Sequence, residues 1–108
     1  MNTTGFIRGL MSKNVSNEDY LKHVTSTVEQ QLQEWDPEYK VFVMKLSNYE
    51  IIVKKEFQYY QLSLPETELS ALQNKSPYSL DKKIWSELVH QGLHLEWGPG
   101  NYLEYVFR

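Results

Sequence analysis

The last third of the chain carries the local signals that most constrain the fold. Ser76-Pro77 is typical of a helix start, because serine caps helix N-termini and proline is tolerated in the first turn. Gly92 is typical of a helix stop, since glycine readily adopts the left-handed conformation that ends many helices. Gly98-Pro99-Gly100 then separates two apolar, β-prone segments, residues 93–97 and 102–107. These signals predict a helix followed by an antiparallel hairpin.

A second helix is predicted upstream, beginning after Ser16. Ser16 and Asp19 have the spacing of a capping box, in which the serine side chain accepts a hydrogen bond from the backbone three residues later. We expect the helix to end before Asp36-Pro37, because a residue that precedes proline disfavours the α conformation. Apolar residues recur between these limits at spacings of three and four, which predicts one buried stripe: Leu21, Val24, Val28, Leu32 and Trp35.

Between the two helices the apolar period changes to two, which is typical of strands. Residues 39–46 have apolar side chains on both faces, so we predict a central strand there. Residues 49–64 are continuously β-prone, and we divide them near Lys54-Lys55-Glu56 because one strand of that length would be unusual. Pro65 then predicts the start of a short helix.

Assembled in chain order, these elements predict an α+β domain over residues 16–108. We expect an antiparallel sheet of four to five strands with two or three helices packed on one face, in the order α-β-β-(β)-α-α-β-β. Residues 1–15 are interpreted as an N-terminal arm that either frays or docks on a partner. The element order of residues 16–108 resembles that of small acidic binding proteins such as secretion chaperones and toxin-immunity proteins, and this resemblance implies protein binding.

The amino-acid composition excludes several kinds of functional site. The 108 residues include no cysteine, which excludes disulfides, zinc–thiolate sites, iron–sulfur clusters and a thiol nucleophile. Eleven basic and 14 acidic side chains give a net charge of −3, which disfavours a broad phosphate-binding surface. Neither a signal-peptide pattern in residues 1–13 nor an apolar run of membrane-spanning length is present, so we expect a cytoplasmic protein.

His94 with its two glutamates, and Asp81 by itself, are candidates for a catalytic or metal-binding role. In the predicted hairpin His94 lies opposite Glu104 with Glu96 on the same outer face, an arrangement that could relay a proton or supply metal ligands. We interpret this group as a solvated charge pair, so no cofactor, metal or enzymatic activity is expected. Asp81 lies inside the apolar arc of its helix, where we favour capping of the first turn over a catalytic role. His23 lies opposite the apolar stripe and is expected to be solvated.

Apolar and aromatic residues support a binding role. The arm carries the apolar residues Phe6, Ile7, Leu10 and Met11. Our first hypothesis is a non-enzymatic protein-interaction module, such as an inhibitor, adaptor or regulatory subunit, which uses this arm or an exposed sheet edge. Such an edge could also pair with a second copy of the chain and form a homodimer.

The second hypothesis concerns the eight tyrosines. Tyr59 and Tyr60 lie near Lys54 and Lys55, and tyrosines interleaved with lysines on a sheet can stack unpaired bases or anchor a protein interface. The alternative function is therefore binding of single-stranded nucleic acid through these four residues. No membrane partner is expected.

Overall fold

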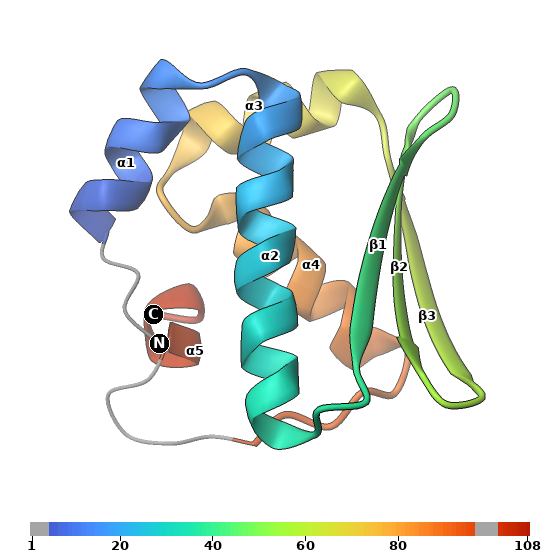
Figure 1. Cartoon of the computed structure of the whole chain (residues 1–108). Helices are drawn as coiled ribbons and strands as arrows, with labels where there is room; N and C mark the ends of the chain where they lie inside the picture. The colour runs from blue at the N-terminus through green and yellow to red at the C-terminus, as the bar shows by residue number, and fades with distance from the viewer. Residues whose placement is uncertain (1–4, 97–101) are drawn as a thin grey trace.

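The computed structural model describes residues 5–96 and 102–108, with side chains from residue 7 onward in the first range. The described residues form an α+β structure with a three-stranded antiparallel sheet and five helices. In Figure 1 the sheet lies at one side of the molecule and the helices lie together at the other. The elements in chain order are α1 (Gly5–Asn14), α2 (Asn17–Trp35), β1 (Lys40–Lys45), β2 (Tyr49–Lys55), β3 (Gln58–Leu64), α3 (Glu66–Lys75), α4 (Ser79–His90) and α5 (Tyr102–Val106).

Helix α2 follows the sequence signals closely. The Ser16 side chain accepts a hydrogen bond from the backbone N–H of Asp19 at 3.2 Å, which confirms the predicted N-terminal cap. At the other end, the backbone N–H of Asp36 still bonds to the carbonyl of Leu32 at 2.9 Å, and the chain then becomes extended. The predicted stripe of α2 lies in the core, with Trp35 packed at its margin.

The sheet is a meander in the order β1–β2–β3. One face packs on the helices and buries Ile51, Val53, Leu62 and Leu64. The division of residues 49–64 is confirmed, since Lys55 pairs with Gln58 across a two-residue turn. The prediction of a central strand at residues 39–46 is wrong, because β1 is an edge strand. Its second apolar face, which carries Phe42 and Met44, is exposed because it points away from the helices.

The predicted strand count of four to five is wrong, because the C-terminal hairpin does not form. Residues 93–96 have no regular secondary structure, and residues 102–106 form helix α5. The predicted turn at residues 98–100 lies outside the described residues. A helix is favoured because it places Tyr102, Leu103 and Val106 together in the core. A strand would have sent Tyr102 and Leu103 to opposite faces.

Helix α4 ends as predicted and begins slightly later. Gly92 has a φ of 105°, its N–H bonds to the carbonyl of Val89, and the N–H of Leu93 bonds to the carbonyl of Leu88, both at 2.9 Å. These two bonds define a Schellman ending. The first helical residue is Ser79, so Ser76-Pro77 forms the link between α3 and α4 rather than the first turn of α4.

Residues 5–14 form helix α1, which the sequence pattern did not predict. The helix is tied to α3, because the Gln73 amide donates hydrogen bonds to the backbone carbonyls of Ser12 at 2.9 Å and Val15 at 3.0 Å. Arg8 points inward from α1 and is fully buried. Among the described residues, no helix has both the length and the apolar character needed to cross a membrane.

Candidate functional site

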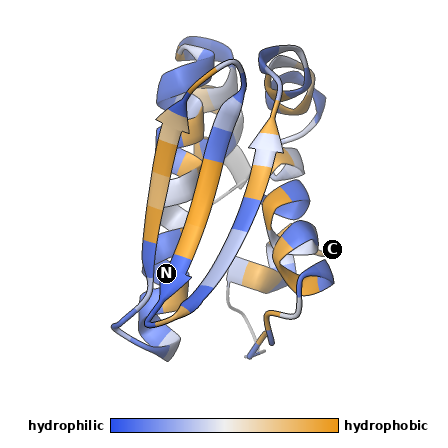
Figure 2. Ribbon diagram, turned by 90° about the vertical axis from the view of Figure 1, so that its right-hand side faces the viewer, coloured by the Kyte–Doolittle hydropathy of each residue, from blue (hydrophilic) through white to orange (hydrophobic). Residues whose placement is uncertain are grey.

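The sheet face that turns away from the helices carries large exposed apolar side chains. Figure 2 looks onto this side of the molecule and shows apolar segments on the outward strands. Phe42 is 50% exposed, Met44 44% and Tyr59 62%, although each lies within a strand. We call this surface the open face, and the strand register places nine side chains on it: Lys40, Phe42, Met44, Glu50, Ile52, Lys54, Tyr59, Gln61 and Ser63.

Apolar side chains continue past both ends of the open face. Phe57 occupies the turn between β2 and β3 and is 95% exposed. The preceding residue, Glu56, has a φ of 53°, in the left-handed region that favours glycine. At the opposite end, Leu46 follows β1 and is also exposed. The turns at both ends of the strands therefore also carry exposed apolar side chains.

Charge is unevenly distributed over the open face. Lys40 and Lys54 are direct cross-strand partners, and like charges in this position repel each other. Lys54 also places its Nζ 5.6 Å from the ring centre of Tyr59, within the range of a cation–π contact. Glu50 lies towards the other end and already accepts hydrogen bonds from Ser63 at 2.6 Å and Gln61 at 3.1 Å. The end that carries the two lysines is therefore positive and aromatic.

The edges of the sheet are partly occupied by side chains from the helices. The Gln91 amide bonds to both the N–H and the carbonyl of Gln61 in β3, at 3.1 and 2.7 Å. On β1, the backbone N–H of Val41 donates to the Glu29 carboxylate at 2.8 Å. These bonds use backbone groups that an added strand would need. An incoming strand would have to displace them.

The pleat of the sheet separates the four residues predicted to form a Lys/Tyr surface. Lys54 and Tyr59 lie on the open face, whereas Lys55 and Tyr60 lie on the face that packs on the helices. Lys55 forms an ion pair with Asp36 at 2.9 Å. The hydrogen bond from Lys55 lowers the pKa of the Asp36 carboxyl below its ordinary value. The four residues do not form one binding surface.

The predicted apolar arm is part of a folded helix. Ile7 and Leu10 are each 48% exposed on α1, and Met11 is half-buried. The side chain of Phe6 lies outside the described part of the structure. Among its described side chains, α1 thus exposes two large apolar residues, fewer than the three on the open face.

His94, Glu96 and Glu104 do not form the predicted group. The strands that would place His94 opposite Glu104 are absent, because Glu104 lies on α5. The described residues contain no cluster of three or more potential metal ligands. His94 instead lies between two pockets, an apolar one of about 640 Å³ and a polar one of about 210 Å³ that it shares with Glu96.

A buried ionic cluster links α1, α4 and α5. The Asp81 carboxylate accepts hydrogen bonds from the Arg8 guanidinium and the Tyr102 hydroxyl, and the Trp85 indole N–H donates to the Tyr102 oxygen at 3.1 Å. All four side chains are buried. Burial lowers the pKa of Arg8, but the charge and hydrogen bond of Asp81 outweigh this effect and hold the pKa above its ordinary value.

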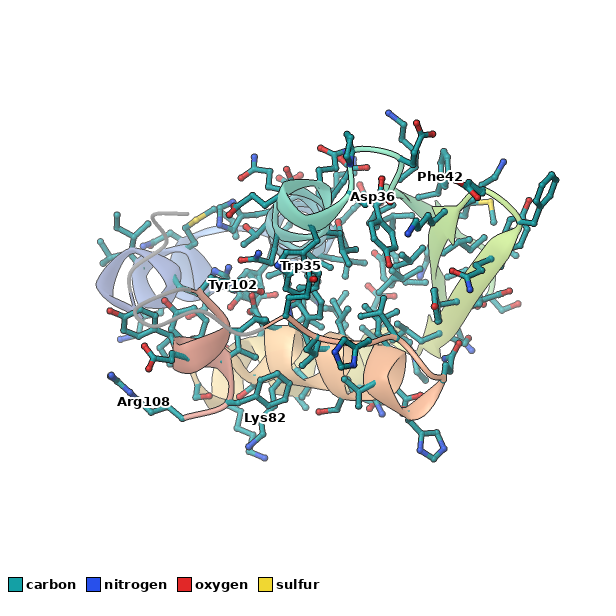
Figure 3. All side chains as sticks on the ribbon, turned by 90° about the horizontal axis from the view of Figure 1, so that it is seen from below. Trp35, Asp36, Phe42, Lys82, Tyr102 and Arg108 are labelled. Carbon is teal, nitrogen blue, oxygen red and sulfur yellow. The ribbon has the colours of Figure 1, made fainter. Side chains whose placement is uncertain are left out.

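The interior position of Tyr102 is visible in Figure 3, where its side chain is drawn among the helices. Burial, together with the neighbouring Asp81 carboxylate, raises the pKa of the Tyr102 hydroxyl well above its ordinary value. The cluster lies entirely inside the protein, so it has no access to a substrate in this structure. We interpret the cluster as structural. Asp81 lies in the first turn of α4 as expected, but its carboxylate is directed to Arg8 and Tyr102 in the interior.

The position of Asp81 is the sequence signal for this cluster. Asp81 lies within an apolar arc, and a buried carboxylate requires a cation or several hydrogen-bond donors. Arg8 carries no such signal, because its place in the predicted arm, residues 1–15, gives no reason to expect it in the core. The prediction that His23 is solvated is also wrong, since the residue is half-buried and its Nε2 atom is enclosed.

Comparison of the chain with models of known families, with curated proteins and with solved structures gave no match.

Proposed function

We propose that this chain is a non-enzymatic protein-binding module whose contact surface is the open face of the sheet. The observation that carries the proposal is the exposure of Phe42, Met44 and Tyr59 within the strands themselves. An antiparallel sheet with one solvated face normally carries polar residues on that face. Contiguous exposed apolar residues, and aromatic residues above all, are typical of protein contact surfaces.

The charge distribution indicates which kind of partner fits. Because Lys40 and Lys54 face each other across the strands, a carboxylate placed between them would relieve their repulsion. Phe42 and Tyr59 lie beside these lysines in the register of the sheet. The partner that we propose is therefore a protein surface that presents an apolar side chain next to an aspartate or glutamate.

The open face is favoured over the sheet edges and over α1. Gln91 and Glu29 already occupy backbone groups at the two edges. Helix α1 exposes Ile7 and Leu10 without an adjoining aromatic cluster among the described side chains. The open face also ends at Phe57, whose turn includes a residue with a strained backbone, a combination that recurs at binding sites.

The test compares two equally exposed pairs of apolar residues. The tagged chain is purified from its native cells at ordinary expression level with nuclease treatment, and a photo-cross-linking residue is placed at position 42 or, as the control, at position 10. Phe42→Ser/Tyr59→Ser is compared with Ile7→Ser/Leu10→Ser. Because these side chains are about half exposed, all variants should keep their thermal stability.

We expect one stoichiometric protein that cross-links from position 42 and not from position 10. Its affinity should fall about thirtyfold or more in Phe42→Ser/Tyr59→Ser, since truncation of a binding hot spot costs about 2 kcal/mol. The proposal is wrong if the affinity is unchanged in that variant, or if only Ile7→Ser/Leu10→Ser reduces it. It is also wrong if the captured material is nucleic acid that nuclease removes.

A further inference from the structure

The positive charges that lack a nearby carboxylate are concentrated in two places. All eleven lysines and arginines lie in the described residues. Five of them have a carboxylate oxygen within 4.0 Å: Arg8, Lys22, Lys45, Lys55 and Lys83. The other six form no such ion pair with the described residues. Two of the six, Lys40 and Lys54, belong to the open face.

The remaining four cations line two adjoining pockets. Lys13 and Lys75 line one pocket of about 250 Å³, and Lys75, Lys82 and Arg108 line another of about 240 Å³. The pockets share Lys75, Ser76 and Pro77, and the described residues that line them include no aspartate or glutamate. We call the two pockets together the basic groove. In Figure 3, Lys82 and Arg108 project from a side of the molecule remote from Phe42.

The basic groove also contains neutral groups that suit an anion. The hydroxyl oxygens of Ser76 and Ser79 are 2.5 Å apart at the start of α4. Tyr78, the N-cap residue of α4, makes no side-chain capping hydrogen bond. Asp81, the acidic residue of its first turn, is turned inward to Arg8 and Tyr102. The lining of the groove therefore combines both hydroxyls with cations from four separate segments of the chain.

An aromatic wall completes the basic groove. The rings of Tyr78 and Tyr105 stack with their centres 6.3 Å apart, and the Arg108 guanidinium lies 4.9 Å from the centre of the Tyr105 ring. Both tyrosines line the pocket that Lys82 and Arg108 share. A flat group attached to an anion could therefore contact this wall.

We propose that the basic groove binds a phosphate monoester group. A carboxylate carries one charge, whereas a phosphate monoester carries nearly two at neutral pH and has three strong acceptor oxygens. Only the phosphate can satisfy several lysines and hydroxyls at once. The groove is distinct from the open face, so this proposal stands whether or not the proposed function is correct.

The experiment follows backbone amide signals of the ¹⁵N-labelled full chain during titration with AMP and with inorganic phosphate at low ionic strength. Adenosine, which lacks the phosphate, is the matched ligand control. Lys75→Gln/Lys82→Gln removes two charges from the groove. Lys22→Gln/Lys45→Gln removes the same charge from two exposed lysines that already face carboxylates, and serves as the control variant.

We expect saturable shifts at Lys75, Ser76, Ser79 and Lys82 with AMP and inorganic phosphate, and none with adenosine. Affinity should fall roughly fivefold or more in Lys75→Gln/Lys82→Gln and remain nearly unchanged in the control, because each lost surface charge contact contributes modestly. The proposal is overturned if adenosine binds as well as AMP, if the shifts lie elsewhere, or if both double variants weaken binding equally. Spectra of the free variants show directly whether each is folded.

Discussion

Replacement of Arg8 by methionine should destabilise the protein severely. Arg8 and Asp81 are both fully buried, and Asp81 receives hydrogen bonds from Arg8 and from Tyr102. Removal of the guanidinium leaves the carboxylate in the interior with the tyrosine as its remaining described side-chain donor. Methionine has a similar length and fills much of the same space, so the change isolates the loss of charge.

The expected loss is about 3–5 kcal/mol, which is typical when one partner of a buried ion pair is removed. A domain of this length has a free energy of unfolding of roughly 5–15 kcal/mol, so Arg8→Met should remove a large part of that free energy. In Arg8→Met/Asp81→Leu the unpaired charge is gone. The main remaining penalty is a less satisfied Tyr102 hydroxyl, about 1–2 kcal/mol. The double variant should therefore be more stable than Arg8→Met.

The assay is urea denaturation of five proteins, followed by tryptophan fluorescence and circular dichroism. They are the wild type, Arg8→Met, Asp81→Leu, Arg8→Met/Asp81→Leu and the control Lys22→Met. Trp85 is a suitable probe because it is buried and bonded to Tyr102. Lys22→Met is the control, since the Lys22 side chain is 63% exposed and its ion pair with Glu18 should be worth less than about 0.5 kcal/mol. The reasoning is refuted if Arg8→Met costs less than about 1 kcal/mol, or if Arg8→Met/Asp81→Leu loses the sum of the two single losses.

Three further outcomes can be measured. Burial and then the charge of Arg8 lower the pKa of His23. The contribution of neutral His23 to stability is therefore present above the ordinary pKa of 6.5 and is lost as the pH falls towards the pKa of the folded state. His23→Gln should flatten this pH dependence in urea denaturation. Glu56→Gly should stabilise the hairpin by about 0.5 kcal/mol because φ is positive there, whereas Glu56→Ala should not. Gln91→Ala frees the backbone of Gln61 and should increase self-association in light scattering.

Local signals predicted the elements whose ends depend on nearby residues. Ser16 and Asp19 form the expected cap. Helix α4 ends where Gly92 bonds to the carbonyl three residues earlier and Leu93 bonds to the carbonyl five residues earlier. Such bonds span only a few residues, so they can be inferred from spacing. Helix α2 and the end of α4 were predicted for this reason, whereas the division of residues 49–64 was predicted because a single strand of that length would be unusual.

Long-range contacts decided the elements that were predicted wrongly. Residues 102–107 have β-prone side chains, but Tyr102 reaches Asp81 and Trp85 only when α5 forms. Once these residues are helical, residues 93–96 have no predicted strand to pair with. The open face was also unpredictable from the apolar pattern of β1, because that pattern fits a central strand as well as an edge strand with an exposed face.

The sequence by itself therefore determined the α+β class, the antiparallel pairing of neighbouring strands and the boundaries set by caps and glycines, since these depend on short-range bonds and periodicity. Only the tertiary structure decided which apolar residues remain at the surface and which charges find partners. Arg8 and Asp81 are 73 residues apart in the chain, and no local pattern links them. The two proposed binding surfaces follow from the same fact, because a residue is free to bind a partner only where the fold leaves it uncovered or unpaired.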